Sequence, residues 1–149
     1  MTKKRWLAIA FFMAAIVALD QWTKALVRVR IPYGAGVPLL PGVVQLTHVE
    51  NVGAAFSMLG GARWFFLALV AVLIRRKLIT KPAEFWCLAA IAGGAVGNAV
   101  DRAASGEVTD MIEPLFINFA VFNVADIFIT CGAIALAVFI IFFDREKKK

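Results

Sequence analysis

Four long apolar stretches, separated by shorter polar ones, dominate the pattern of this 149-residue chain. A helix needs about 20 mostly apolar residues to cross a bilayer, and each stretch is close to that length. The pattern predicts membrane-spanning helices over about 6–27, 62–79, 82–103 and 121–143. We therefore expect an all-α membrane protein, a four-transmembrane-helix bundle that forms a single integral membrane domain over 1–149.

Two segments between these helices have a different character. Residues 28–53 contain three prolines, several glycines and short β-branched runs, which are typical of turns and short strands. This composition predicts a small β-rich element outside the membrane, between the first two helices. The segment 104–120 is predicted to be an extracytoplasmic loop on the same side of the membrane.

Composition and charge support a membrane protein. The chain is 62% hydrophobic with a mean hydropathy of +0.83, whereas soluble domains are typically about 45–50% apolar. The net charge is +6, and basic residues gather at 3–5, 75–81 and 145–149, beside apolar stretches. The positive-inside rule then places both termini in the cytoplasm. This placement explains the basic residues better than nucleic-acid binding does, so we expect no nucleic-acid partner.

Cysteine and histidine are scarce. Cys87 and Cys131 lie within apolar stretches and are predicted to be packed thiols rather than a disulfide. His48 is the only histidine, which excludes a histidine-based metal cluster, and we interpret it as a solvated loop side chain. The glycines at 93–97 lie inside an apolar helix and do not match a phosphate-binding or dinucleotide-binding motif. We therefore expect neither a metal nor a cofactor.

Acidic residues interrupt the apolar stretches near one depth. At ~1.5 Å rise per residue, Asp20 lies ~22 Å from the start of its helix, Asp101 ~30 Å and Asp126 ~27 Å from the cytoplasmic ends of theirs. The hydrocarbon core is about 30 Å thick, so all three approach its outer boundary. A charge inside a bilayer costs ~2.5–3.5 kcal/mol on insertion scales, which makes such residues candidates for a functional site.

Asp20 and Lys24 are four residues apart on the first predicted helix. This spacing places them on one face, where they can form an ion pair. A structural salt bridge and a catalytic role both fit the pair. A nucleophilic serine needs a nearby base, and neither Ser57 nor Ser105 has a histidine in its motif. A serine–lysine pair with Lys24 as the base is therefore a weaker candidate.

Two neighbouring carboxyl groups can cleave an amide without a metal. They share one proton, so that one activates water while the other protonates the carbonyl oxygen. Asp126 begins the last helix, and Asp110 lies in the loop before it, close enough for the loop to bring them together. Other pairs of acids remain open on these grounds. Asp101, next to Arg102, is interpreted as a structural ion pair.

Five sequence blocks, in this order and spacing, resemble those of lipoprotein signal peptidase, also called signal peptidase II. They are DQWTK (20–24), NVGAAFSML (51–59), GGAVGNAVDR (93–102), GEVTDMI (106–112) and FNVADIFI (122–129). Each block alone is a modest signal, but five in the same order along nearly the whole chain are highly specific.

The resemblance implies an aspartyl endopeptidase of the bacterial cytoplasmic membrane with its active site facing outward. Such enzymes remove the signal peptide from diacylglyceryl-modified prolipoproteins, cutting just before the lipidated cysteine, and globomycin inhibits them. The family fold implies a four-helix bundle with an extracytoplasmic β-cradle and a short extramembrane helix. The expected partners are prolipoprotein substrates, membrane lipids and globomycin-type inhibitors, and we expect a monomer.

The resemblance also implies roles for individual residues. Asp110 and Asp126 match the catalytic dyad. The residues that match positions binding substrate or supporting the dyad are Asn51, Asn98, Asp101, Arg102, Asn123, Asp20 and Lys24. Two positions depart from the family pattern: Met111 replaces a more usual phenylalanine, and Ile127 replaces a small hydroxyl residue. These departures affect packing and substrate preference more than the chemistry.

Two other functions fit buried acidic residues. A proton- or cation-coupled transporter would have titratable groups strung across the membrane. The inner half of each predicted helix, however, lacks acids until the cytoplasmic end. In a non-catalytic scaffold, the aspartates would only pair with Lys24 and Arg102, which leaves no partner for Asp110.

Overall fold

The structure, a computed structural model, describes residues 2–53 and 81–143. Its main elements are the helices α1 (Lys3–Arg30), α4 (Pro82–Ser105) and α5 (Val124–Val138), and α5 continues as the π-helical segment η1 (Phe139–Phe143). The predicted helix over 62–79 lies outside the described residues. Within the part that is described, three helices are long and apolar enough to cross a membrane, with mean hydropathies of 1.5, 1.3 and 2.5.

The helix ends follow local sequence signals. Helix α1 extends three residues beyond the predicted 27 and stops where Ile31 turns extended before Pro32, because the residue before a proline avoids the helical region. Helix α4 starts with Pro82 in its first turn and ends at Gly106, whose φ of +83° is the left-handed conformation of a helix C-terminus. Helix α5 begins later than the predicted 121 because Phe122 pairs with Ile112 as an isolated bridge.

An antiparallel three-stranded sheet lies beyond the helices, in the order β1 (Gly36–Leu40), β2 (Val44–Asn51) and β3 (Val108–Pro114). The first two strands form the β-rich element predicted over 28–53. The prediction of a loop over 104–120 was wrong in its middle. The segment Val108–Pro114 is too short to stand out in the sequence, and it becomes a strand because β2 offers it a partner.

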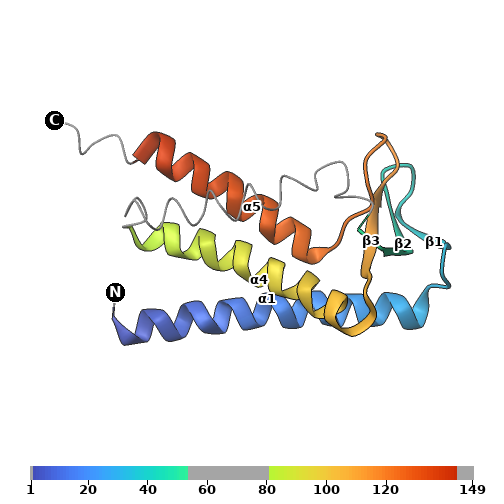
Figure 1. Cartoon of the computed structure of the whole chain (residues 1–149). Coiled ribbons are helices and arrows are strands. Elements are labelled where there is room, and N and C mark those ends of the chain that lie inside the picture. The colour runs from blue at the N-terminus through green and yellow to red at the C-terminus, as the bar shows by residue number, and fades with distance from the viewer. Residues whose placement is uncertain (1, 54–80, 144–149) are drawn as a thin grey trace.

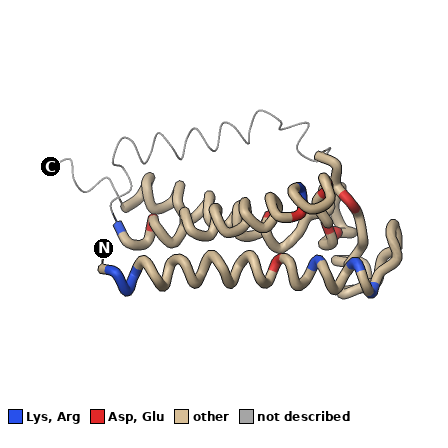
Figure 2. The backbone as a smooth tube through the Cα atoms, turned by 60° about the horizontal axis from the view of Figure 1, so that its bottom comes forward, with Lys and Arg blue, Asp and Glu red and all other residues tan. Residues whose placement is uncertain are grey.

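The three helices lie side by side, and the sheet covers one end of them (Figure 1). The N-terminus and the end of α5 lie at the opposite end. Charged residues lie at the start of α1, near the start of α4 and toward the sheet, and the stretches of the described helices between these positions carry none (Figure 2). We call the end that carries the sheet the sheet end.

Glycines in α4 let the other two helices approach closely. A Cβ on Gly94 would lie 2.4 Å from the carbonyl oxygen of Ala125, and one on Gly97 would lie 2.6 Å from Asp20 Oδ2. Either distance is shorter than real Cβ contacts, so a side chain at these positions would push a neighbouring helix away. The small residues therefore bring the polar side chains of three helices into contact at the sheet end.

The interior at the sheet end is polar rather than apolar. Asp20, Lys24 and Asn123 are each 0% exposed, while large apolar side chains on α1, such as Phe11 and Trp22, are exposed. This arrangement suits a protein whose surroundings are lipid, because apolar residues gain nothing from facing inward there. The buried polar groups instead need partners inside the protein.

Two sequence interpretations need correction. His48 is not a solvated loop residue: it is buried in β2, only 9% exposed. Cys87 is packed as predicted, but Cys131 is exposed on α5. Both errors have one cause, since neither residue type indicates which face of its element points inward.

Candidate active site

Lys24 lies at the centre of a buried ion cluster. Its ammonium group is 2.7 Å from Asp20 Oδ2, 2.7 Å from Asp101 Oδ2 and 2.9 Å from Asn98 Oδ1. An ammonium group has three hydrogens to donate, and these three acceptors use all of them. The contact between Asp20 and Lys24 that their spacing predicted is therefore present, but within a larger cluster.

Asp101 does not pair with Arg102, contrary to the sequence interpretation. Its Oδ1 accepts a hydrogen bond from Arg28 Nη2 at 3.0 Å and another from the amide of Gln21 at 3.1 Å. Adjacent helical residues point about 100° apart, so Arg102 faces away from Asp101. With Lys24 and Arg28 facing Asp20 and Asp101, the cluster contains two positive and two negative side chains.

The ion cluster orients Asn98 toward the next acid. Lysine only donates, so the oxygen of the Asn98 amide must face Lys24. The nitrogen then faces the other way, and it donates to Asp126 Oδ1 at 2.9 Å. Asp20 reaches α5 as well, because its Oδ1 accepts a hydrogen bond from the backbone N–H of Ala125 at 2.9 Å.

Asn123 joins the start of α5 to strand β3. Its side-chain oxygen accepts from the backbone N–H of Asp126 at 3.0 Å, and the Asp126 carboxylate accepts in return from the backbone N–H of Asn123 at 3.2 Å. This reciprocal capping fixes the first turn of the helix. The Asn123 amide nitrogen also donates to Asp110 Oδ1 at 2.6 Å.

Asp110 is held from both sides by amides. Asn123 donates to its Oδ1, and Asn51, at the end of β2, donates to its Oδ2 at 2.8 Å. The carboxyl group is buried, with the residue 3% exposed. Asp110 and Asp126 thus come from a strand and a helix and meet around Asn123.

Burial raises the pKa of the Asp110 carboxyl from 3.8 to about 6, chiefly by desolvation. The nearby charge of Asp126 raises this pKa further, while the hydrogen bonds from Asn51 and Asn123 lower it. A carboxyl group with such a pKa can hold or release a proton near neutral pH, which general acid–base chemistry requires.

Both carboxyl groups line one cavity of about 550 Å³ at the sheet end. Asn51, Asn98 and Arg102 line it too, and apolar residues of α5 extend its wall along the helix. Six of the nine predicted site residues line this cavity: Asp110, Asp126, Asn51, Asn98, Asn123 and Arg102. Asp101 lines a separate cavity. Asp20 and Lys24 lie behind its wall and hold Asn98 in place.

The two departures from the family pattern fall in different surroundings. Met111 is 3% exposed and packs with Val27 and Ile31 beneath the sheet. Ile127 is 39% exposed and lines the cavity one residue beyond Asp126. Met111 is therefore a packing residue beside β3, and Ile127 is part of the cavity wall.

The sequence interpretation missed Arg28, Gln21 and Thr109. Arg28 and Gln21 share a helix with Lys24 and Asp20, and Thr109 precedes Asp110. Their spacing from these acids was visible in the sequence, but their partners are more than 70 residues away. Over residues 2–53 and 81–143, no group of three or more histidine, cysteine or acidic side chains is placed to hold a metal ion.

The fold and the site define a helical membrane protein with a buried polar site at one end of its helices. A family model described as signal peptidase (SPase) II matches residues 12–142. The chain is 40% identical to the lipoprotein signal peptidase of Brevibacillus brevis, an alignment that covers 91% of this chain and 95% of the relative. It is 37% identical to that of Enterococcus faecalis, over 97% and 95%.

Solved structures agree with this assignment. Two bacterial membrane enzymes, determined by the in meso method, match with TM-scores of 0.73 and 0.70 at 28% and 26% identity. Both matches cover 95% of this chain, and they cover 92% and 94% of the solved chains. The chain therefore belongs to the signal peptidase II family, a family of membrane peptidases.

Proposed function

We propose that this protein is an aspartyl endopeptidase that removes the signal peptide from diacylglyceryl-modified prolipoproteins and cuts N-terminal to the lipidated cysteine. The observation that carries the proposal is the pair of carboxyl groups of Asp110 and Asp126, which share Asn123 and line one cavity. Family membership supports the substrate class.

The chemistry follows from one proton shared by two acids. Two close carboxyl groups do not both ionise readily, so the pair carries one proton near neutral pH. The ionised carboxylate removes a proton from water, which attacks the scissile carbonyl carbon, while the protonated carboxyl group donates to the carbonyl oxygen. Collapse of the tetrahedral intermediate releases the signal peptide as a carboxylic acid and leaves a free amine on the lipidated cysteine.

The surrounding side chains position this reaction. Asn51, Asn98 and Asn123 each donate a hydrogen bond to one of the two acids, which fixes where their oxygens point. Arg102 lines the same cavity and offers donors for the carbonyl groups of a bound peptide. Lys24 of the ion cluster donates a hydrogen bond to the Asn98 side-chain oxygen and so fixes the orientation of this amide.

The position of the cavity suits a lipid-anchored substrate. Its wall continues from Asp126 along α5 through Ile127 and Thr130, so acyl chains that stay in the membrane keep the scissile bond near the acids. Burial of a lipid chain contributes ~0.8 kcal/mol per CH₂ group. The proposal includes a bacterial cytoplasmic membrane location, cytoplasmic termini, an outward-facing site, a fourth helix over 62–79, a monomeric state and inhibition by globomycin at the acid pair.

The test is cleavage of a synthetic diacylglyceryl-cysteine precursor peptide by the purified protein. Asp110→Asn and Asp126→Asn should each remain folded and lose cleavage, because an amide cannot exchange the required proton. Glu113→Gln is the matched control, since it neutralises an acid on the same strand that contacts Gln45 instead of the cavity. Retained turnover in either Asn variant contradicts the proposal.

A proton- or cation-coupled transporter is less well supported. Such a protein needs titratable groups along the length of its helices. In the described part of the chain, the acidic residues of the helices lie toward the sheet, apart from Glu84 near the start of α4 (Figure 2). Asp110 and Asp126 line one cavity at the sheet end rather than a path across the membrane.

A further inference from the structure

Both ring nitrogens of His48 face hydrogen-bond acceptors. Nδ1 lies 2.8 Å from the backbone oxygen of Ile31, and Nε2 lies 3.0 Å from Glu50 Oε1. A carbonyl oxygen only accepts, so Nδ1 must carry a hydrogen. The neutral ring would then present its lone pair at Nε2 to Glu50, so the contact holds only with a proton between Nε2 and Oε1.

The backbone of β2 creates this contact. The register between β2 and β3 shifts between Leu46 and Val49, which leaves Thr47 and His48 opposite the single residue Met111. Such a bulge turns the affected side chains relative to the regular strand. His48 is consequently directed at the end of α1 rather than at solvent, and Tyr33 packs edge-on against its ring at 5.8 Å.

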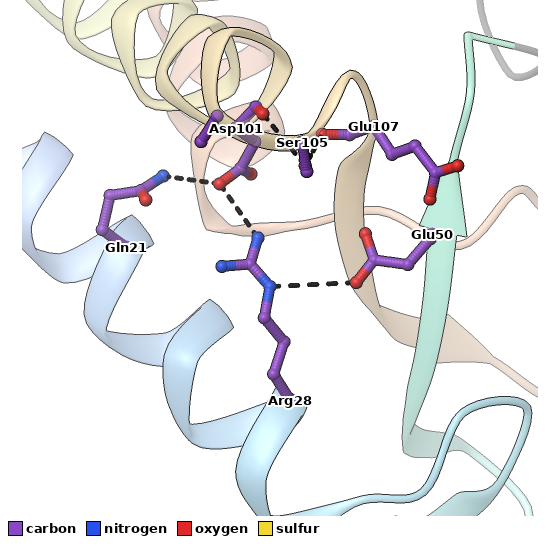
Figure 3. A pocket seen from close by; sticks show the side chains of 7 residues that line it. Gln21, Arg28, Glu50, Asp101, Ser105 and Glu107 are labelled. Carbon is purple, nitrogen blue, oxygen red and sulfur yellow. Dashed lines mark hydrogen bonds and ion pairs between the residues drawn. The ribbon is translucent and has the colours of Figure 1, made fainter.

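Glu50 connects His48 to the strand that carries Asp110. The hydroxyl of Thr109, opposite Glu50 across the ladder, donates to the Glu50 carboxylate, with its Oγ1 at 3.0 Å from Oε1 and 3.1 Å from Oε2. The same hydroxyl accepts a hydrogen bond from Arg28 Nε at 2.7 Å. Arg28 lies in turn against Asp101 (Figure 3).

These contacts lie on the opposite side of the strands from the proposed active site. Glu50 and Arg28 line a second cavity of about 470 Å³, whereas Asn51 and Asp110 line the first. Successive residues of a strand point to opposite faces, so anchoring Thr109 on one face sets the rotation of β3 that aims Asp110 on the other.

We propose that His48 and Glu50 share a proton and act as a positioning pair, holding Asp110 in its working orientation through Thr109. Neither residue touches the cavity that contains the two acids. The expected effect on cleavage rests on the proposed function, whereas the proton shared by His48 and Glu50 does not. Loss of that proton leaves the Nε2 lone pair facing the Glu50 carboxylate. The contacts that link His48 to β3 through Glu50 and Thr109 are then weakened.

Other charged groups around His48 favour or oppose this proton. Arg28 Nε, on α1, is 3.8 Å from Glu50 Oε1 and competes for that oxygen. On β3, Asp110 pairs with Val49, the residue after His48. Asp101 and Glu107 line the second cavity with Glu50. Strand β1 contributes no ionisable side chain. The ring itself contacts the Ile31 carbonyl oxygen at the C-terminal end of α1 and the Glu50 carboxylate.

The proton can be observed directly because His48 is the only histidine in the chain. ¹⁵N-histidine labelling of the full-length protein in lipid nanodiscs gives one imidazole to follow through a pH titration. In Glu50→Gln, which removes the carboxylate that shares the proton, the ring should lose its proton at a lower pH than in the unchanged protein. Glu113→Gln, which removes an acid at the far end of the same ladder, should leave the titration unchanged. An unchanged titration in Glu50→Gln overturns the proposal.

Three forms of position 48 then test the positioning role. His48→Gln keeps a donor toward Glu50 that does not titrate, and His48→Phe keeps a ring without a donor. As pH rises through the imidazole titration, kcat of the unchanged protein should fall roughly tenfold, the effect of one charge-assisted hydrogen bond, with KM unchanged. The two acids also lose their shared proton as pH rises, so the comparison is between the forms. His48→Gln should lack this tenfold part of the fall, and His48→Phe should be slow throughout.

Amide hydrogen exchange over 108–114 gives the same test without turnover. The unchanged protein should lose protection relative to His48→Gln only above the pH at which the ring titrates. Equal protection in the two proteins at every pH, or an alkaline fall in kcat of the same size in His48→Gln as in the unchanged protein, overturns the proposal. If no form cleaves the lipidated peptide, the proposed function fails, and the exchange and titration results still decide this inference.

Discussion

The side-chain amide of Asn123 donates to Asp110 at 2.6 Å while its oxygen caps the helix that begins with Asp126. One residue therefore performs two separable tasks: it starts α5 and it places Asp110 beside that start. Backbone hydrogen bonds between Ile112 and Phe122 already join β3 to the segment before α5, and Asn123 adds a side-chain link to each of the two acids.

Replacing Asn123 should separate these two tasks. Ser at position 123 can still cap the helix but cannot reach Asp110 with an amide, whereas Ala does neither. We expect Asn123→Ala to lose about 1 kcal/mol of stability relative to Asn123→Ser. Both variants should lose roughly 10²-fold in kcat, the effect of removing one positioned donor. Melting temperature and turnover of the lipidated peptide check the two parts separately. A Ser variant with full activity contradicts the positioning role.

Removing the charge of Lys24 should destabilise the protein strongly. Lys24→Met keeps the volume but leaves Asp20 and Asp101 without their ammonium partner in a fully buried site. Breaking one partner of a buried ion pair costs about 3–5 kcal/mol. Thermal unfolding in nanodiscs measures the change. The double variant Lys24→Met/Asp20→Asn should recover part of the lost stability because it removes one of the two carboxylates left without an ammonium partner. No recovery in the double variant argues against the charge explanation.

Gly94→Ala should loosen the contact between α4 and α5. The added methyl would meet the Ala125 carbonyl oxygen at 2.4 Å and Ile129 at 2.8 Å, so the helices must separate. Overpacking of this kind costs about 1–3 kcal/mol. Val96→Ala is the control on the same helix, because Val96 is exposed and its change meets no neighbour. If Gly94→Ala melts at the same temperature as Val96→Ala, the close approach of α4 and α5 is wrong.

The raised pKa of Asp110 has a consequence for stability. Between pH 3.8 and about 6, the folded protein holds a proton on Asp110 that the unfolded chain has released. Stability therefore falls as pH rises through this window and stays lower above it. Asp110→Asn does not titrate, so its stability relative to the unchanged protein should rise by up to ~3 kcal/mol between pH 4 and pH 7. Below pH 4 the relative stability should stay constant.

Chemical unfolding of the two proteins at pH 7 and at pH 4 provides this comparison. Glu113→Gln, on the same strand and in contact with Gln45, should show no comparable gain at pH 7. If the difference in stability between Asp110→Asn and the unchanged protein is the same at pH 7 and at pH 4, the raised pKa of Asp110 is contradicted.

The sequence predicted the spanning helices well because their signal is long and local. The ends of α1 and α4 fall within three residues of the predicted ones, and α5 begins three residues late. The spacing of Asp20 and Lys24 also predicted a contact, since residues four apart on a helix are neighbours. The fourth predicted helix, over 62–79, stays a prediction.

Contacts between distant segments could not be predicted in the same way. Asp101 was assigned to its neighbour Arg102, but its partners are Lys24 and Arg28 on another helix. Strand β3 exists because β2 lies beside it, which no local pattern of seven residues indicates. His48 was placed in solvent for the same reason, since the bulge that buries it depends on the register with β3.

The central claim is that Asp110 and Asp126 together activate a water molecule to cut before the lipidated cysteine. Single-turnover cleavage of the diacylglyceryl-cysteine precursor in H₂¹⁸O, followed by mass spectrometry, tests it most directly. The account predicts one ¹⁸O atom in the new carboxyl group of the released signal peptide, an unlabelled lipidated product with a free amine, and no product with Asp110→Asn or Asp126→Asn. Cleavage at another bond, or labelled product from either variant, would contradict it.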